Sequence, residues 1–317
     1  MTLAVEAGAV VLPAGRVLAI GARGDTDLSA VPNAEVVTSF KPDYDLWSER
    51  GRAVHKAIAG PADGAVIFLP RAKQQARDWI ARALALGCPV VVDGQKTSGI
   101  DSMLKALRSE ASVGAPFAKA HGKVFTVEPT SAFAHWQQPD LVEVGGWKTA
   151  PGAFSADGPD PASVALADAL PPLAGRVADL GAGWGFLSAK ILEQEKVGHA
   201  DLVEADCHAL EAARANINDP RAQFHWADAL SWQAEPYDHI VSNPPFHTER
   251  RADPALGIGF IRRAARLLAP SGTFWLVANR HLPYEAALSE EFGQVTELPG
   301  PPAFKLIRAS RPARKRR

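Results

Sequence analysis

Short apolar runs alternate with amphipathic stretches along the first half of the chain. Three runs rich in valine, isoleucine and leucine end at glycine or proline, at residues 16–21, 64–70 and 89–94. Runs of this length and composition predict buried strands. Residues 72–86 carry apolar side chains at helical spacing, Ile80 and Leu84 among them, and therefore predict a helix between the second and third strands.

The second half of the chain repeats this alternation. Apolar runs predict further strands at residues 176–180, 200–203, 223–226 and 237–242. A stretch with helical spacing, residues 187–194, follows the first of them. Two more runs, 294–298 and 303–307, flank a Pro-Gly-Pro-Pro turn and predict a terminal antiparallel hairpin. Strands that alternate with helices favour an α/β fold with a doubly wound, mostly parallel sheet.

Length and composition are those of a globular protein. With 317 residues, the chain is long enough for two domains, each with a core of its own. Its longest apolar run near the start, residues 7–12, is far too short to span a bilayer, so we expect a cytoplasmic protein with no membrane association. The two cysteines, Cys88 and Cys207, provide neither a disulfide framework nor a metal site, and we expect both to be buried.

The predicted strand 176–180 runs into a turn that carries Gly181, Gly183 and Gly185. Residues without a Cβ atom let the backbone approach a nucleotide-like ligand closely. Glu204 ends the next predicted strand, where it can accept hydrogen bonds from ribose hydroxyls. A dinucleotide fingerprint would need a glycine at position 186, where the chain has Phe186, so the spacing fits S-adenosylmethionine better. A plain βα connection is the alternative for a glycine turn alone.

The predicted strand 237–242 ends at Asn243-Pro244-Pro245-Phe246. An exocyclic amino group is a poor nucleophile because its lone pair is delocalised, and two acceptors that hold its N–H bonds can turn that lone pair toward an electrophile. The side-chain oxygen of Asn243 and the carbonyl of Pro244 are such acceptors. The prolines make the turn rigid, and Phe246 offers a flat surface for stacking. The motif predicts methyl transfer to an exocyclic or amide nitrogen; a structural Pro-Pro turn is the alternative.

The glycine turn and the Asn-Pro-Pro turn occur in the order found in class I S-adenosylmethionine-dependent methyltransferases, which this chain resembles. The resemblance is more specific to the small-subunit ribosomal RNA guanine-N2 methyltransferases of the RsmC type. It is carried by residues 151–160, 179–185, 242–247, 277–284 and 304–305. The chain departs from that family after Asp160, where Pro161-Ala162-Ser163-Val164-Ala165-Leu166 stands in place of the usual Gly-Ser pair and leucines.

The resemblance implies a reaction and a partner. The enzyme would transfer a methyl group from S-adenosylmethionine to the exocyclic N2 of a guanine in 16S ribosomal RNA. Its partner would be ribosomal RNA or the small ribosomal subunit, and we expect a monomer. Because the cofactor carries the driving force, positioning matters more than a strong base, and we assign no catalytic role to His247.

The resemblance also distributes roles over the site. Gly181 and Gly183 would line the methionine part of the cofactor, and Glu204 would bind its ribose. Asp179 would order the glycine turn or face the methionine amine. Asp228 would receive the adenine amino group, unless it only caps the turn that follows it. The catalytic positions are those of the second turn, Asn243, Pro244, Pro245 and Phe246, and the first of them also borders the cofactor.

The fold implied is two tandem Rossmann-like methyltransferase domains. Residues 1–147 would be a degenerate copy with an RNA-binding or structural role, because its glycine turn is reduced to residues 21–24 and it has no Asn-Pro-Pro string. Residues 148–310 would be the catalytic domain, a seven-stranded, mostly parallel sheet with an antiparallel terminal hairpin. Glycine and proline between residues 142 and 152 indicate a linker. Residues 311–317 would form a basic tail.

Charge is unevenly distributed in the second half. Residues 151–317 hold 18 Lys and Arg against 20 Asp and Glu, and without the last seven residues the bases fall to 13. An enzyme that acts on RNA needs positive charge, which the tail could supply, although a solvated tail that aids solubility is an equal alternative. Four bases at predicted strand ends of the first half are candidates for phosphate contacts, unless they form a solvated face: Arg71, Lys73, Arg77 and Lys96.

Three other functions are compatible with the motifs. A protein methyltransferase acting on a glutamine N5 amide uses the same Asn-Pro-Pro logic, but Tyr usually follows its prolines where this chain has Phe246. Adenine-N6 methylation of nucleic acid could use the same four residues. A non-catalytic RNA-binding assembly factor is the third, and the intact glycine turn argues against it. The nucleotide, and whether naked RNA or an assembled subunit is modified, are left open.

Overall fold

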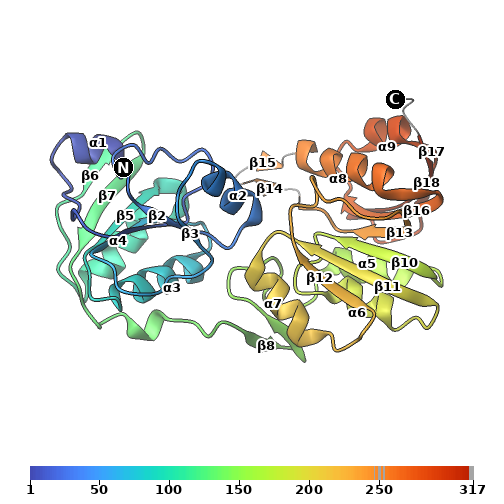
Figure 1. Cartoon of the computed structure of the whole chain (residues 1–317), viewed down its shortest axis with the longest axis horizontal. Helices are drawn as coiled ribbons and strands as arrows, with labels where there is room; N and C mark the ends of the chain where they lie inside the picture. Colours follow the sequence, from blue (N-terminus) through green and yellow to red (C-terminus); the bar gives the residue numbers. More distant parts are fainter. Residues whose placement is uncertain (246, 249–250, 253, 314–317) are drawn as a thin grey trace. The chain divides into compact units, whose positions relative to one another are not determined.

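The computed structural model describes residues 1–245, 247–248, 251–252 and 254–313 (Figure 1). The chain divides into two compact units, Met1–Asp140 and Leu141–Arg317. In the described part of each unit, seven strands form one sheet. Among the described helices, none combines the length and the apolar character that crossing a membrane requires.

The first unit has the strand order β3-β2-β1-β4-β5-β7-β6. Neighbouring strands are parallel from β3 to β5, and β7 is antiparallel to β5 and β6. Its strands are β1 (Val17–Ile20), β2 (Glu35–Val37), β3 (Val54–His55), β4 (Gly64–Phe68), β5 (Val90–Gln95), β6 (Phe117–Lys119) and β7 (Gly122–Val127). Its helices are α1 (Thr2–Glu6), α2 (Lys41–Glu49), α3 (Lys73–Leu84) and α4 (Ile100–Arg108), with 3₁₀ turns η1 (Lys96–Ser98) and η2 (Ala134–Trp136).

The second unit has the corresponding order β12-β11-β10-β13-β16-β18-β17. Its strands are β10 (Gly175–Leu180), β11 (Val197–Glu204), β12 (Ala222–Trp226), β13 (Tyr237–Ser242), β16 (Leu268–Asn279), β17 (Phe292–Leu298) and β18 (Phe304–Pro312). Two small antiparallel sheets join β8 (Val142–Val144) to β9 (Trp147–Thr149) and β14 (His247–Thr248) to β15 (Arg251–Ala252). Its helices are α5 (Pro161–Ala169), α6 (Phe186–Leu192), α7 (Cys207–Asn216), α8 (Pro254–Leu267) and α9 (Glu285–Glu291).

Both sheets therefore follow one connection pattern, and the expected tandem α/β fold is confirmed. The predicted strands of both halves are present, each within a few residues of its predicted bounds. The terminal hairpin is also present, since β18 pairs antiparallel with β17 and with β16. The short strands β2 and β3 were not predicted, because runs of three and two residues carry no resolvable periodicity.

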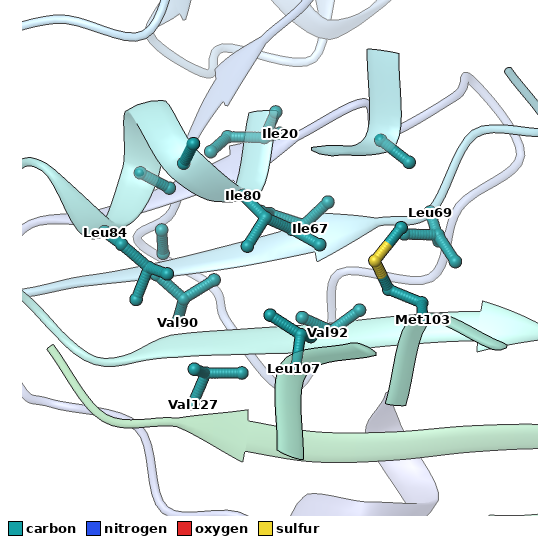
Figure 2. Close-up of a cluster of buried hydrophobic side chains, with 14 of the residues drawn as sticks. Ile20, Ile67, Leu69, Ile80, Leu84, Val90, Val92, Met103, Leu107 and Val127 are labelled. Atoms are coloured by element: carbon teal, nitrogen blue, oxygen red, sulfur yellow. The ribbon is translucent and has the colours of Figure 1, made fainter. Parts of the chain in front are cut away.

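The core of the first unit shows why its apolar runs form strands. Branched side chains of β1, β4, β5 and β7 face helices α3 and α4, and Ile80 and Leu84 of α3 lie over Ile67 and Val90 (Figure 2). Ile80 is fully buried. The predicted apolar face of the helix is thus the face that packs on the sheet. Cys88 and Cys207 are buried, as expected.

A buried carboxylate ties the strands of the second unit together. Asp201, on β11, accepts hydrogen bonds from Tyr237 Oη (2.7 Å), Arg176 Nη2 (2.7 Å) and His225 Nε2 (2.6 Å). Burial alone would raise the pKa of Asp201, but these hydrogen bonds outweigh it and hold that pKa well below its usual range. The three partners come from β13, β10 and β12, so the network connects four adjacent strands.

Residues 142–152, expected as a linker, are largely structured. Strands β8 and β9 form a hairpin within the second unit, and its turn residues Gly145 and Gly146 have φ of 57° and 84°. Two consecutive positive φ angles are the geometry of a tight hairpin turn, which glycine adopts without strain. The glycines that indicated a flexible boundary therefore make a two-residue turn. The first unit ends at Asp140, before this hairpin.

The glycine turn of the first unit is covered by a side chain. Gly21 follows β1 as Gly181 follows β10, and its φ is 72°. A Cβ atom on Gly21 would stand 2.4 Å from the indole ring of Trp79, on α3. The space that a ligand would need over this residue is thus occupied by the protein itself.

Candidate active site

The glycine turn of the second unit follows the carboxyl end of β10. Gly181, Gly183 and Gly185 have φ of 77°, 55° and 89°, in the left-handed region that favours glycine. A Cβ atom on Gly185 would stand 2.9 Å from Ile217 Cδ1, so this glycine allows the start of α6 to pack closely against the end of α7. A Cβ atom on Gly183 would meet nothing within 4 Å. The backbone at Gly183 is therefore open to a ligand.

Glu204 lies beside this turn at the end of β11. Its Oε2 accepts a hydrogen bond from Gly183 N (2.7 Å), and its Oε1 accepts one from Asp206 N (2.8 Å). Burial raises the pKa of Glu204 to about 7, although these backbone donors oppose the shift. Each oxygen keeps a lone pair for a further donor. The predicted ribose acceptor is thus held against the predicted cofactor turn.

Asp179 lies behind the turn, on β10, and is 2% exposed. Ser188 Oγ donates to its Oδ2 at 2.7 Å, while its Oδ1 is buried without a hydrogen-bond partner among the described residues. Burial raises the pKa of Asp179 to about 6. A buried acceptor without a partner is costly, so this site favours a ligand that brings a positive charge or an N–H donor.

Asp228 follows β12 and caps the next turn. Its Oδ1 accepts a hydrogen bond from Leu230 N (2.9 Å), and its backbone carbonyl accepts one from Ser231 N (3.1 Å). Ala227 N donates to Glu204 O, which brings Asp228 to the edge of the sheet where Glu204 lies. The capping role is therefore real, and it uses one carboxylate oxygen.

The Asn-Pro-Pro turn follows β13, the strand next to β10. Ser242 Oγ donates to Leu180 O at 2.6 Å and so joins the two strand ends. A Cβ atom on Gly181 would stand 3.9 Å from Pro245 Cδ. The structure therefore brings the two predicted motifs into contact. Phe246 lies outside the described residues.

The side chain of Asn243 is fixed by two contacts that sequence reasoning missed. Its Nδ2 donates to Asp160 Oδ2 (2.9 Å) and to Ser163 Oγ (2.8 Å). Asp160 caps α5, since the same Oδ2 accepts a hydrogen bond from Ser163 N at 3.0 Å. An Asp-Pro pair is a recognisable helix start, but nothing local indicates that this helix meets a residue about eighty positions later.

An aromatic cluster borders the glycine turn. Trp147 of β9 lies 5.3 Å from Trp184 and 5.6 Å from Phe186, measured between ring centroids. Asn216 accepts from Lys148 N and donates to the carbonyls of Lys148 and Trp184, at 2.7, 2.8 and 2.9 Å. These contacts fasten the β8–β9 hairpin to the segment that forms the turn.

Comparisons with known proteins place this geometry in a class. Residues 146–308, a range that contains both turns, match the model of the methyltransferase small domain. A solved structure, the T. Thermophilus 16S rRNA N2 methyltransferase (RsmC) in complex with AdoMet and guanosine, superimposes with a TM-score of 0.78. It covers 96% of this chain and 90% of that one, at 24% identity. The fold is thus that of a methyltransferase.

Curated relatives narrow the class. The ribosomal RNA small subunit methyltransferase C of Chromohalobacter salexigens is 30% identical over 83% of this chain and 84% of its own length. The protein of the same name from Sodalis glossinidius is 32% identical over 82% and 77%. The chain belongs to the methyltransferase small domain family, and within it to the ribosomal RNA small subunit methyltransferase C proteins. The resemblance inferred from the sequence is confirmed.

Proposed function

We propose that this protein transfers the methyl group of S-adenosylmethionine to the exocyclic N2 of a guanine in 16S ribosomal RNA. The observation that carries the proposal is the orientation of Asn243. Because both its Nδ2 hydrogens are directed to Asp160 and Ser163, its side-chain oxygen is the atom available to a substrate N–H. The names of the relatives and the guanosine in the similar structure support the same reaction.

The residues around the glycine turn fit the cofactor. Asp179 Oδ1, buried and without a partner among the described residues, suits an ammonium group. Gly183 leaves room for the ligand at the backbone, and Glu204 can accept from two ribose hydroxyls. When bound, the cofactor supplies an electrophilic methyl group on a sulfonium. The contacts of Gly181 with the methionine part of the cofactor and of Asp228 with its adenine amino group stay predictions.

On the substrate side, the protein positions the guanine amino group and does not activate it with a general base. Asn243 Oδ1 and the Pro244 carbonyl would accept hydrogen bonds from the two N–H groups of the guanine amino group, which would align its lone pair for methyl transfer. Once methylated, the nitrogen would release one of these two protons. The rigid Pro244-Pro245 turn keeps these acceptors in place. Stacking of the base on Phe246 stays a prediction from the sequence.

We also propose that the first unit binds RNA phosphates and no cofactor. Trp79 covers its glycine turn, which leaves no room for a ligand there. Arg71, Lys73 and Lys96 are exposed at the carboxyl ends of β4 and β5. Arg77 differs from them, because its guanidinium lies 4.8 Å from the Trp136 ring and packs within the unit.

The remaining parts of the proposal concern the cellular location, the oligomeric state and the partner. We propose a cytoplasmic monomer that meets ribosomal RNA or the small subunit. The basic tail would add charge to RNA binding; its residues 314–317 lie outside the described part.

The test is nucleoside analysis by mass spectrometry of 16S ribosomal RNA from cells that lack the protein. We expect one N2-methylguanosine to disappear and to return with the wild type, but not with Asn243→Ala. Asn33→Ala, at an exposed asparagine of the first unit, is the matched control and should restore it.

An unchanged N2-methylguanosine content in the deletion strain would overturn the proposal. The same acceptor pair could hold an adenine N6 or a glutamine amide. The same samples are therefore analysed for N6-methyladenosine, and the ribosomal proteins for methylglutamine. Loss of either modification would assign that reaction instead.

A further inference from the structure

Asn243 is held at the amino end of α5, a helix that belongs to neither of the two motifs. Its carboxamide has a nitrogen and an oxygen of nearly the same size, so its partners decide which of them faces the substrate. A carboxylate such as that of Asp160 only accepts. The contact at 2.9 Å therefore requires the nitrogen to face α5.

The partners of Asn243 are themselves well fixed. Asp160 Oδ2 accepts from Ser163 N as the helix cap, and Pro161 follows at the first helical position. Ser163 is 8% exposed, and the neighbouring Ala162 and Leu166 lie in the core of the unit. A packed helix end thus presents a carboxylate and a hydroxyl as a rigid pair of acceptors.

We propose that Asp160 and Ser163 are positioning residues for methyl transfer, which hold the carboxamide of Asn243 with its oxygen toward the substrate. This inference rests on the proposed function. A flipped carboxamide would present an N–H donor to the substrate amino group, which is also a donor. The two hydrogen bonds exclude that state, so they raise the fraction of enzyme that can align the lone pair.

The first test is steady-state kinetics of two single variants. Asp160→Asn keeps a good helix cap but removes the acceptor-only partner, so the carboxamide of Asn243 can turn. Ser163→Ala removes the second acceptor. We expect kcat to fall about 10- to 100-fold in Asp160→Asn, as for loss of a hydrogen bond to a charged group, and about 3- to 10-fold in Ser163→Ala, as for loss of a neutral one. KM for RNA and Kd for S-adenosylmethionine should stay within about 3-fold of the wild type in both variants. Ser163→Thr keeps the hydroxyl and should recover most of the rate.

Matched controls separate positioning from general effects of the substitutions. Asp27 in the first unit also accepts from a backbone N–H, that of Ser29, and from a hydroxyl, that of Thr2. Ser109 donates to a helix carbonyl, Ala106 O. Asp27→Asn and Ser109→Ala should leave kcat unchanged.

A reciprocal exchange tests the direction of the hydrogen bond. Asn243→Asp alone places two carboxylates in contact and should leave only a small, measurable residual turnover. Combined with Asp160→Asn, the amide at position 160 can donate to the carboxylate at 243, whose other oxygen again faces the substrate. We expect the double variant to exceed Asn243→Asp in kcat by about 10-fold, the equivalent of one charged hydrogen bond.

Hydrogen exchange of the Asn243 side-chain amide, followed by NMR, gives a readout independent of activity. We expect slow exchange in the wild type and faster exchange in Asp160→Asn and Ser163→Ala. Fast exchange in the wild type, or kcat within about 2-fold of wild type in both single variants, would overturn the inference, since about 0.4 kcal/mol is less than one hydrogen bond. An inactive wild type with slow exchange would contradict the proposed function and leave the positioning contact established.

Discussion

At the scale of single residues, the site holds two carboxyl groups whose ionised form is disfavoured by burial. Asp179 is buried with one oxygen unpaired among the described residues, and Glu204 is partly buried, with backbone N–H groups as its hydrogen-bond donors. Burial raises the pKa of both groups, so ionising them opposes folding. Groups that cost stability and lie together at a strand edge are typical of binding sites.

The cost at Asp179 predicts a pH-dependent effect of Asp179→Asn. The folded pKa, about 6, lies above the ordinary value, so the folded state binds the extra proton and the wild type loses stability as pH rises from about 4 to 6. Asparagine cannot ionise and still accepts from Ser188. Urea unfolding should show the variant gaining about 3 kcal/mol over the wild type between about pH 4 and pH 8. Parallel stability curves for the two proteins would contradict this.

Glu204 predicts a pH dependence of cofactor binding. Its pKa is raised to about 7 by burial, and only the ionised group offers both oxygens to ribose hydroxyls. We expect Kd for S-adenosylmethionine, measured by calorimetry, to fall as pH rises from about 6 to 8. Glu204→Gln should remove this dependence and weaken binding at the higher pH by about 10-fold or more. A variant that keeps the wild-type pH profile would assign the dependence to another group.

The residues of the site differ in how far the sequence could predict them. Gly181 and Gly183 were predictable, because a turn with positive φ requires glycine and the pattern is local. The partners of Asn243 were not, because Asp160 and Ser163 reach it only through the packing of α5. The capping role of Asp228 was among the sequence-based alternatives, and the structure shows it.

At the scale of elements, the glycine turn is the part that connects strand, helix and ligand. The turn leaves β10 in a left-handed conformation and enters α6 at Gly185, while Asn216 of α7 binds the carbonyl of Trp184. The hairpin β8–β9 is fastened to the same asparagine. The glycine and proline content of residues 142–152 predicted a linker, and only the contact with α7 reveals that the hairpin is attached to the second unit.

Two glycine substitutions should separate the structural and binding roles of this turn. Gly185→Ala meets Ile217 and Ala213 at 2.9 and 3.1 Å in addition to backbone strain, so we expect a loss of about 2 to 4 kcal/mol in the free energy of unfolding. Gly183→Ala enters open space and should cost only about 1 kcal/mol of strain.

Gly183→Ala, the variant that costs less stability, should nevertheless weaken cofactor binding. The new methyl group occupies the space left for the ligand, so Kd for S-adenosylmethionine should rise at least about 10-fold while the protein stays folded. Urea unfolding and calorimetry on the same preparations measure both effects. Unchanged affinity in Gly183→Ala would place the cofactor away from this residue.

At the scale of the whole molecule, two units share one strand order but differ at the same edge of the sheet. The carboxyl edge of the second unit carries the open glycine turn and Asn243. That of the first carries a turn closed by Trp79 and the bases Arg71, Lys73 and Lys96. Residues 1–140 hold 15 Lys and Arg against 14 Asp and Glu, whereas residues 141–317 hold 19 against 21. The fold was predictable from alternating apolar runs. The different functions proposed for the two units depend on which side chains lie at the carboxyl edge of each sheet.

The positive charge at the carboxyl edge of the first unit's sheet predicts a contribution of this edge to RNA binding. Within the first unit, all of which is described, no recorded ion pair engages Arg71 or Lys96. If both contact phosphates, Arg71→Ala with Lys96→Ala should weaken RNA binding and reduce the slope of log affinity against log salt by about 1.5. Lys105→Ala with Arg108→Ala, which removes an equal charge from the far end of α4, should leave the slope unchanged. Equal slopes for the two pairs, measured by fluorescence anisotropy over a salt series, would mean that the first unit binds RNA by another surface or serves a structural role.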